Sequence, residues 1–66
     1  MHVWINGNRH ELDEGAGVPE ALVALGAPAS GVAVAVDGEV VPRAAWAATA
    51  LVDGARVEVL TAVQGG

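Results

Sequence analysis

The chain contains no cysteine, and in a sequence of 66 residues this absence limits how it can fold. Small domains bury a modest share of their surface, so many depend on disulfides or on a metal held by cysteine. Here an apolar core has to supply the stability alone. Because Trp4 and Trp46 are the only aromatic residues, that core must consist of Val, Ala and Leu side chains.

Alternating apolar residues and tight-turn signals predict four or five strands and one main helix. The expected strands are residues 2–6, 9–12, 32–36, 39–41 and 56–63, and the expected helix is residues 18–25. Asn6-Gly7 and Asp37-Gly38 are typical hairpin turns, because Asn, Asp and Gly tolerate positive φ. Residues 43–51 are rich in alanine and could hold one further helical or 3₁₀ turn.

This order of elements predicts an α+β domain in which one main helix covers one face of a mixed four- to five-stranded sheet. The first and last expected strands carry the cleanest apolar faces and are the natural central pair. If they pair in parallel, the fold is a β-grasp, or ubiquitin-like, domain. We expect this domain to span residues 1–63 and a flexible C-terminal tail to follow at residues 64–66. Pro42 should confine the strand before it to a sheet edge or a strand end.

The charge balance excludes several classes of partner. Three arginines stand against eight acidic residues, there is no lysine, and the formal net charge is −5. Nucleic-acid binding needs clustered positive charge, and anionic membrane surfaces attract it, so neither partner is expected. No apolar stretch is long enough to span a bilayer and no signal peptide is recognisable, which predicts a cytoplasmic protein.

No group of residues in the sequence is typical of a catalytic or metal site. His2 and His10 are expected at equivalent outward positions of the first hairpin, but no third metal ligand has a useful spacing. The hydroxyl residues have no neighbouring base, and the acidic residues are scattered. The sequence therefore predicts neither an autonomous enzyme nor a bound cofactor or metal.

The diglycine Gly65-Gly66, which follows the longest expected strand, is the most informative motif. A carboxylate is a poor electrophile until ATP converts it into an acyl-adenylate, from which a sulfur nucleophile can displace AMP. To be activated, the tail must enter a narrow channel of a partner enzyme, and glycine has no side chain to block that passage. The motif therefore favours a reactive carboxylate on Gly66 over a merely frayed end.

Over its whole length the chain resembles the ThiS family of thiamin-biosynthesis sulfur carriers, which are ubiquitin-like proteins. The resemblance rests on the Asn6-Gly7 turn, on Val41-Pro42-Arg43 followed by Trp46, on Asp53-Gly54 and on the closing diglycine. The related molybdopterin synthase small subunit usually has a longer chain and a Pro-rich stretch before its glycines. Here Thr61-Ala62-Val63-Gln64 stands at that place.

The resemblance implies that the Gly66 carboxylate is adenylated by an E1-like, ThiF-type adenylyltransferase that consumes ATP. A sulfur donor such as a persulfide-bearing protein would then convert it into a thiocarboxylate, and a ThiG-type thiazole synthase would accept the sulfur. Gly65 and Gln64 would give the tail its passage through the channel. No residue of the chain itself would act as an acid, a base or a ligand.

A partner surface is expected on the sheet face that the helix leaves open. Leu60 and Ala62 should point outward there, and Arg43 and Trp46 are candidate anchors because Arg and Trp are favoured at interfaces. Two alternatives are that Trp46 adds bulk to the edge of the core and that Arg43 is solvated or pairs with an acid.

Three other functions remain open from the sequence. The chain could carry sulfur for another pathway, such as molybdopterin or cysteine synthesis. It could be a non-covalent ubiquitin-like binding module, in which case loss of Gly65-Gly66 would leave its function intact. It could also be conjugated through Gly66 to other proteins.

Overall fold

The computed structural model describes residues 1–28 and 30–61. In chain order the elements are β1 (His2–Ile5), β2 (Asn8–Glu11), α1 (Val18–Leu25), β3 (Val32–Val36), β4 (Glu39–Val41), the 3₁₀ helix η1 (Arg43–Ala48) and β5 (Arg56–Thr61). The predicted order is confirmed, and the bounds of α1, β3 and β4 are those expected. The first two strands differ from the prediction by one residue at their ends. Residues 62 and 63 of the last expected strand lie outside the described part of the chain.

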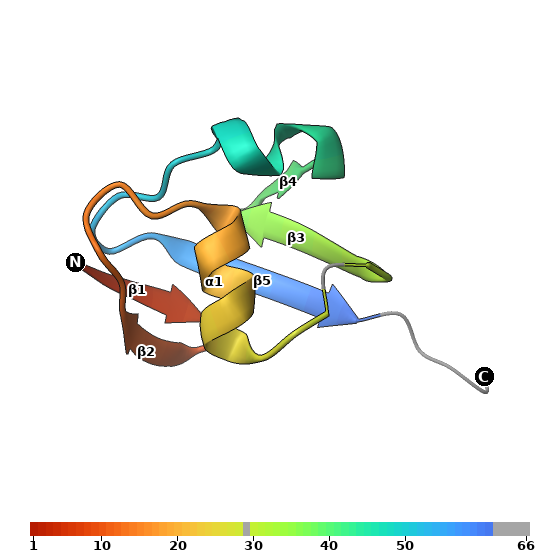
Figure 1. Ribbon diagram of the computed structural model, residues 1–66. Helices are drawn as coiled ribbons and strands as arrows, with labels where there is room; N and C mark the ends of the chain where they lie inside the picture. The colour runs from red at the N-terminus through yellow and green to blue at the C-terminus, as the bar shows by residue number, and fades with distance from the viewer. Residues whose placement is uncertain (29, 62–66) are drawn as a thin grey trace.

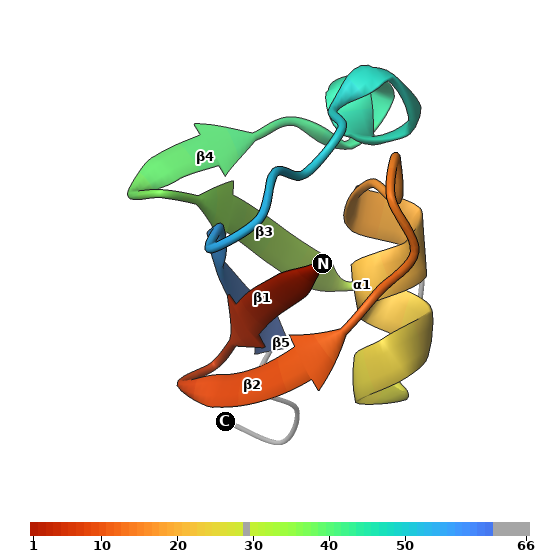
Figure 2. The same cartoon turned by 90° about the vertical axis from the view of Figure 1, so that its left-hand side faces the viewer.

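The five strands form one mixed sheet in the order β2-β1-β5-β3-β4. β1 and β5 pair in parallel, with Trp4 opposite Arg56 and Ile5 opposite Val57, whereas the other pairs are antiparallel. Helix α1 lies across one face of the sheet and leaves the other face open (Figures 1 and 2). This is the β-grasp arrangement predicted from the sequence, and β4 lies at a sheet edge, as Pro42 requires.

Two glycines and one acidic side chain set the limits of α1. The backbone N–H of Gly17 donates to Glu20 Oε1 at 2.7 Å, which fixes the start of the helix. Gly26 ends it in the left-handed conformation, with φ 77°. Gly17 also passes close to the chain after η1: a Cβ at this position would lie 2.7 Å from the carbonyl oxygen of Thr49. Any side chain at residue 17 would therefore force the start of the helix or the backbone of Thr49 to shift.

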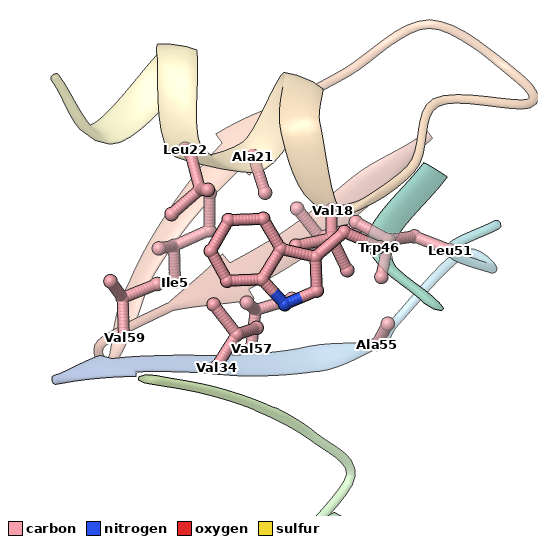
Figure 3. Close-up of a cluster of buried hydrophobic side chains, with 11 residues drawn as sticks. Ile5, Val18, Ala21, Leu22, Val34, Trp46, Leu51, Ala55, Val57 and Val59 are labelled. Carbon is pink, nitrogen blue, oxygen red and sulfur yellow. The ribbon is translucent and has the colours of Figure 1, made fainter. Parts of the chain in front are cut away.

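The core fills the space between α1, η1 and the sheet (Figure 3). It is aliphatic apart from one indole, and its members are Val3, Ile5, Val18, Ala21, Leu22, Val34, Trp46, Leu51, Ala55, Val57 and Val59. Trp46 is only 7% exposed, and its indole N–H donates to the carbonyl oxygen of Val41 at 2.9 Å. Trp46 thus supplies the bulk that a core of Val, Ala and Leu lacks.

Within residues 1–28 and 30–61, no helix is long and apolar enough to cross a membrane.

Candidate functional site: the open sheet face and its central strand

β5 occupies the centre of the sheet and is the last strand before the diglycine. On one side it pairs with β1 only as far as Ile5 and Val57, and on the other it pairs with β3 as far as Val32 and Thr61. β5 is therefore held on both sides by strands distant in sequence, which makes it a rigid support for whatever follows Thr61.

The side chain of Asn6 forms hydrogen bonds to β5 beyond the point where β1 ends. The chain turns away after Ile5, and Asn6 adopts a left-handed backbone with φ 51°. Its side-chain amide then takes the place of a strand residue. Nδ2 donates to the carbonyl oxygen of Val59 at 3.1 Å, and Oδ1 accepts from the Val59 N–H at 2.8 Å. Asn6 is thus a side-chain brace that continues the β1–β5 ladder by one more residue.

The open face of the sheet carries an apolar patch made of Leu60, Val40, Ala33 and Ala35. Antiparallel register places Ala33 opposite Leu60 and Ala35 opposite both Glu58 and Val40, so these side chains share one face. Leu60 is 70% exposed and Val40 is 76% exposed. Together with Glu58 they line a shallow groove of about 120 Å³. An exposed patch of this kind on a small domain is suited to docking a partner.

The structure places Leu60, Trp46 and Arg43, three of the candidate partner residues named from the sequence, in different parts of the domain. Leu60 lies on the open face as predicted, but Trp46 is buried and is not an exposed anchor, which confirms the alternative that it belongs to the core. Arg43 lies on η1, outside the sheet, with its guanidinium carbon 5.9 Å from the centre of the Trp46 ring. Ala62, Gln64, Gly65 and Gly66 lie outside the described residues.

Val40 is the exposed residue of the patch that the sequence analysis missed. The signal was present, because a two-residue turn at Asp37-Gly38 pairs Val36 with Glu39 and hence Ala35 with Val40. The alanines of β3 and Val40 of β4 therefore had to share a face.

The two histidines do not form a pair, contrary to the expectation of equivalent outward positions. His10 lies opposite Val3, whose side chain is fully buried, whereas His2 lies opposite Glu11 on the open face. Cross-strand partners share a face, so the two imidazoles lie on opposite sides of the sheet. No group of three or more metal-ligating side chains occurs in the part of the chain that the structure describes.

Comparison with models of known protein families gives a match. The model of the ThiS family matches residues 3–66, which is nearly the whole sequence and includes Gly65 and Gly66. The chain belongs to the ThiS family. The predicted resemblance is therefore confirmed, and the fold agrees with this family assignment.

Two solved ThiS-type structures are similar to the chain over its full length. The crystal structure of the thiamine biosynthesis protein ThiS from Geobacter metallireducens is 40% identical, covers 100% of both chains and superposes with a TM-score of 0.81. The solution structure of a thiamine biosynthesis protein from the same organism is 40% identical and covers 100% of this chain and 88% of that one, with a TM-score of 0.78. No curated protein matches the chain.

Proposed function

We propose that the chain is a sulfur carrier of thiamin biosynthesis and that the carboxylate of Gly66 is the group that carries the sulfur. The observation that supports this most strongly is the ThiS-family match, which runs through residue 66 and so includes the diglycine. The β-grasp sheet with β5 at its centre supplies the stiff support that such a terminus needs. Proteins of this family are carriers rather than enzymes, in agreement with the sequence prediction.

In the proposed reaction a Gly66 carboxylate oxygen attacks the α-phosphorus of ATP, and pyrophosphate leaves. The product is an acyl-adenylate. A sulfur nucleophile then attacks the acyl carbon, so that a C–S bond forms and the C–O bond to AMP breaks. With hydrosulfide as the nucleophile the product is a thiocarboxylate, and a persulfide donor requires an additional thiol to release it. An E1-like, ThiF-type partner would bind the ATP and perform both steps.

In this reaction the chain itself would supply a tail that is long enough to reach the partner's active site and narrow enough to enter it. Residues 64–66 serve as the tail of a domain that spans residues 1–63 in this proposal. Five residues follow Thr61, and an extended chain spans at most about 3.5 Å per residue, so Gly66 can lie at most roughly 17 Å beyond the sheet. A partner's active site can therefore be buried to about that depth, and Gly65 and Gln64 must pass through its entrance.

The apolar patch is the surface we assign to the first partner contact. It ends at Leu60, one residue before the last described residue of β5. A partner seated on Leu60 and Val40 would therefore hold the sheet close to the point from which the tail enters its channel. Because a carrier also has to release its sulfur to a second enzyme, we expect a ThiG-type thiazole synthase to use the same side of the sheet in turn.

Reconstitution with purified components tests the proposal. The chain is incubated with ATP, sulfide and a ThiF-type adenylyltransferase, and its intact mass is measured. We expect the mass change that corresponds to replacement of one oxygen by sulfur, confined to the C-terminal fragment. A control chain extended by one alanine after Gly66 should remain unmodified. An unmodified wild-type chain, or conversion only by the adenylyltransferase of the molybdopterin pathway, would contradict the assignment to thiamin biosynthesis.

A further inference from the structure

A second feature of the open face lies away from the apolar patch, on β2, β1 and the start of β5. Trp4 is paired with Arg9 on one side and with Arg56 on the other, so three side chains form one row across three neighbouring strands. Figure 2 shows these strands side by side. Trp4 is 41% exposed and both arginines are exposed. We refer to Arg9, Trp4 and Arg56 as the cation–aromatic row.

The charges of the protein are unevenly distributed around this row. On the open face the two arginines of the row are balanced by Glu11 and Glu58, so that this face is formally neutral. All other charged side chains, one arginine and six acids, account for the whole net charge of −5. The row thus holds two of the three cationic side chains of a strongly acidic chain.

Among the described residues, no carboxylate forms an ion pair with either guanidinium of the row. Within residues 1–28 and 30–61 the one ion pair shorter than 4.0 Å joins the N-terminal amine to Glu14. Asp37 of the β3–β4 turn lies beside the row, where its Oδ1 accepts from the backbone N–H of Arg56 at 2.9 Å, but it forms no ion pair with either guanidinium. Two arginines and a tryptophan are therefore exposed and available for a partner.

The surroundings of the row limit the size of what it can bind. Trp4 and Arg56 line a shallow groove of about 680 Å³, whose rim includes the turns at Gly7 and Gly38. Two acids, Asp37 and Glu58, also line this groove, and Glu11 follows Arg9 on the open face of β2. The positive region is thus only one row wide, which suits one or two carboxylates next to an apolar side chain.

We propose that the cation–aromatic row docks a short acidic segment of the enzyme that activates the C-terminus. A carboxylate of that segment would bind Arg9 and Arg56, and an adjacent apolar side chain would cover Trp4. The identity of the partner rests on the proposed function, whereas its acidic chemistry rests on the row alone. Attraction between the two arginines and the acidic segment would raise the association rate, and added salt would weaken this effect. Without the arginines the acidic carrier would repel the segment.

A nucleic acid would be a poorer occupant of the same row. Electrostatic forces reach about 10 Å at moderate salt, so a short peptide senses only the charges nearest the row. A long polyanion would also extend over the acidic side chains that lie beyond the row. The chain's net charge of −5 therefore opposes the polyanion and favours the short acidic segment.

Steady-state kinetics of tail activation test the proposal. Arg9→Gln and Arg56→Gln are compared with Arg43→Gln, which removes the same charge from η1, outside the sheet. We expect each row variant to raise the KM for the carrier about tenfold at low salt, with kcat unchanged, and to flatten the dependence of KM on salt. Arg43→Gln should leave both unchanged. Equal KM values for all three variants would overturn the proposal, provided that thermal melts show each one folded.

If the wild-type chain were not activated, that result would contradict the proposed function but not the acidic chemistry of the partner. A fluorescence measurement tests that chemistry separately. Trp46 is buried, so ionic quenchers report on Trp4. Iodide should quench more strongly than caesium despite the net charge of −5, and the Arg9→Gln/Arg56→Gln double variant should lose this preference. The peptide acetyl-Glu-Glu-Leu-Glu-amide should perturb Trp4 fluorescence, unlike its lysine counterpart. No preference for iodide, or saturation by oligothymidylate but not by the acidic peptide, would overturn the proposal.

Discussion

Asn6 braces β5 beyond the end of β1, so replacing its side chain should lower the free energy of unfolding. Asn6→Ala removes both amide hydrogen bonds and leaves the N–H and the carbonyl of Val59 without these partners. Each lost hydrogen bond costs about 1 kcal/mol. Alanine must also adopt the left-handed conformation of residue 6, at φ 51°, which costs roughly 1 kcal/mol more. The expected loss is thus about 3 kcal/mol.

Such a loss is large for this protein. Marginal stability of about 0.05–0.15 kcal/mol per residue gives a chain of this size roughly 3–10 kcal/mol in total. A loss of about 3 kcal/mol should lower the Tm by roughly 12–24 °C, since each kcal/mol shifts a small domain by about 4–8 °C. Asn6→Asp keeps the acceptor for the Val59 N–H and tolerates the left-handed backbone, but it loses the donor and places an oxygen against the Val59 carbonyl, so its loss should be at least about 1 kcal/mol.

Thermal and urea unfolding followed by circular dichroism measures these differences. Asn8→Ala is the matched control, because Asn8 lies on β2 in the same hairpin and is exposed, and its cost should stay within about 0.5 kcal/mol. Hydrogen exchange at the Val59 amide should accelerate in Asn6→Ala while the amides between β3 and β4 stay protected. If Asn6→Ala were as stable as Asn8→Ala, the side chain would not brace β5 and the reasoning would be refuted.

Three further predictions concern the helix seat, the core and the apolar patch. Gly17→Ala should cost about 1–3 kcal/mol in denaturant unfolding, because its Cβ would lie 2.7 Å from the Thr49 carbonyl oxygen; wild-type stability would show that this contact relaxes freely. Trp46→Ala should cost about 3–5 kcal/mol and lose most of the near-ultraviolet circular dichroism signal, since it empties the centre of the core. Leu60→Ser should leave the Tm unchanged but raise the KM of activation about tenfold, whereas Val23→Ser, an equally exposed change on α1, should not affect KM. A parallel loss of stability in Leu60→Ser would contradict the assignment of this residue to a partner surface.

Local sequence patterns were sufficient to predict most of the fold. The alternation in Val32–Val36 and the helical spacing of Val18, Leu22 and Leu25 gave the element types, and the two-residue turns at Asn6-Gly7 and Asp37-Gly38 gave the hairpins. These signals depend on neighbours a few residues apart, so they can be interpreted without knowing the tertiary structure.

The arrangement of the candidate site depends on pairings that local patterns do not determine. The cation–aromatic row exists because Trp4 lies opposite Arg56, which is a parallel pairing of residues far apart in sequence. Trp46 follows an exposed arginine on a short 3₁₀ helix, and only the packing of η1 against α1 shows that its indole is buried. The position of His10, in contrast, could have been deduced, because a two-residue turn that pairs Ile5 with Asn8 also pairs Val3 with His10.

In the proposed function, sulfur passes from a donor to the Gly66 carboxyl carbon and from there to a thiazole ring. The most direct test loads the chain with isotopically labelled sulfur, adds it to a ThiG-type thiazole synthase with its other substrates and follows the label by mass spectrometry. We expect the thiazole product to gain the label in proportion to its loss from the carrier, and the carrier to return to its unmodified mass. If the label stayed on the carrier while unlabelled thiazole formed, Gly66 would not be the source of the thiazole sulfur.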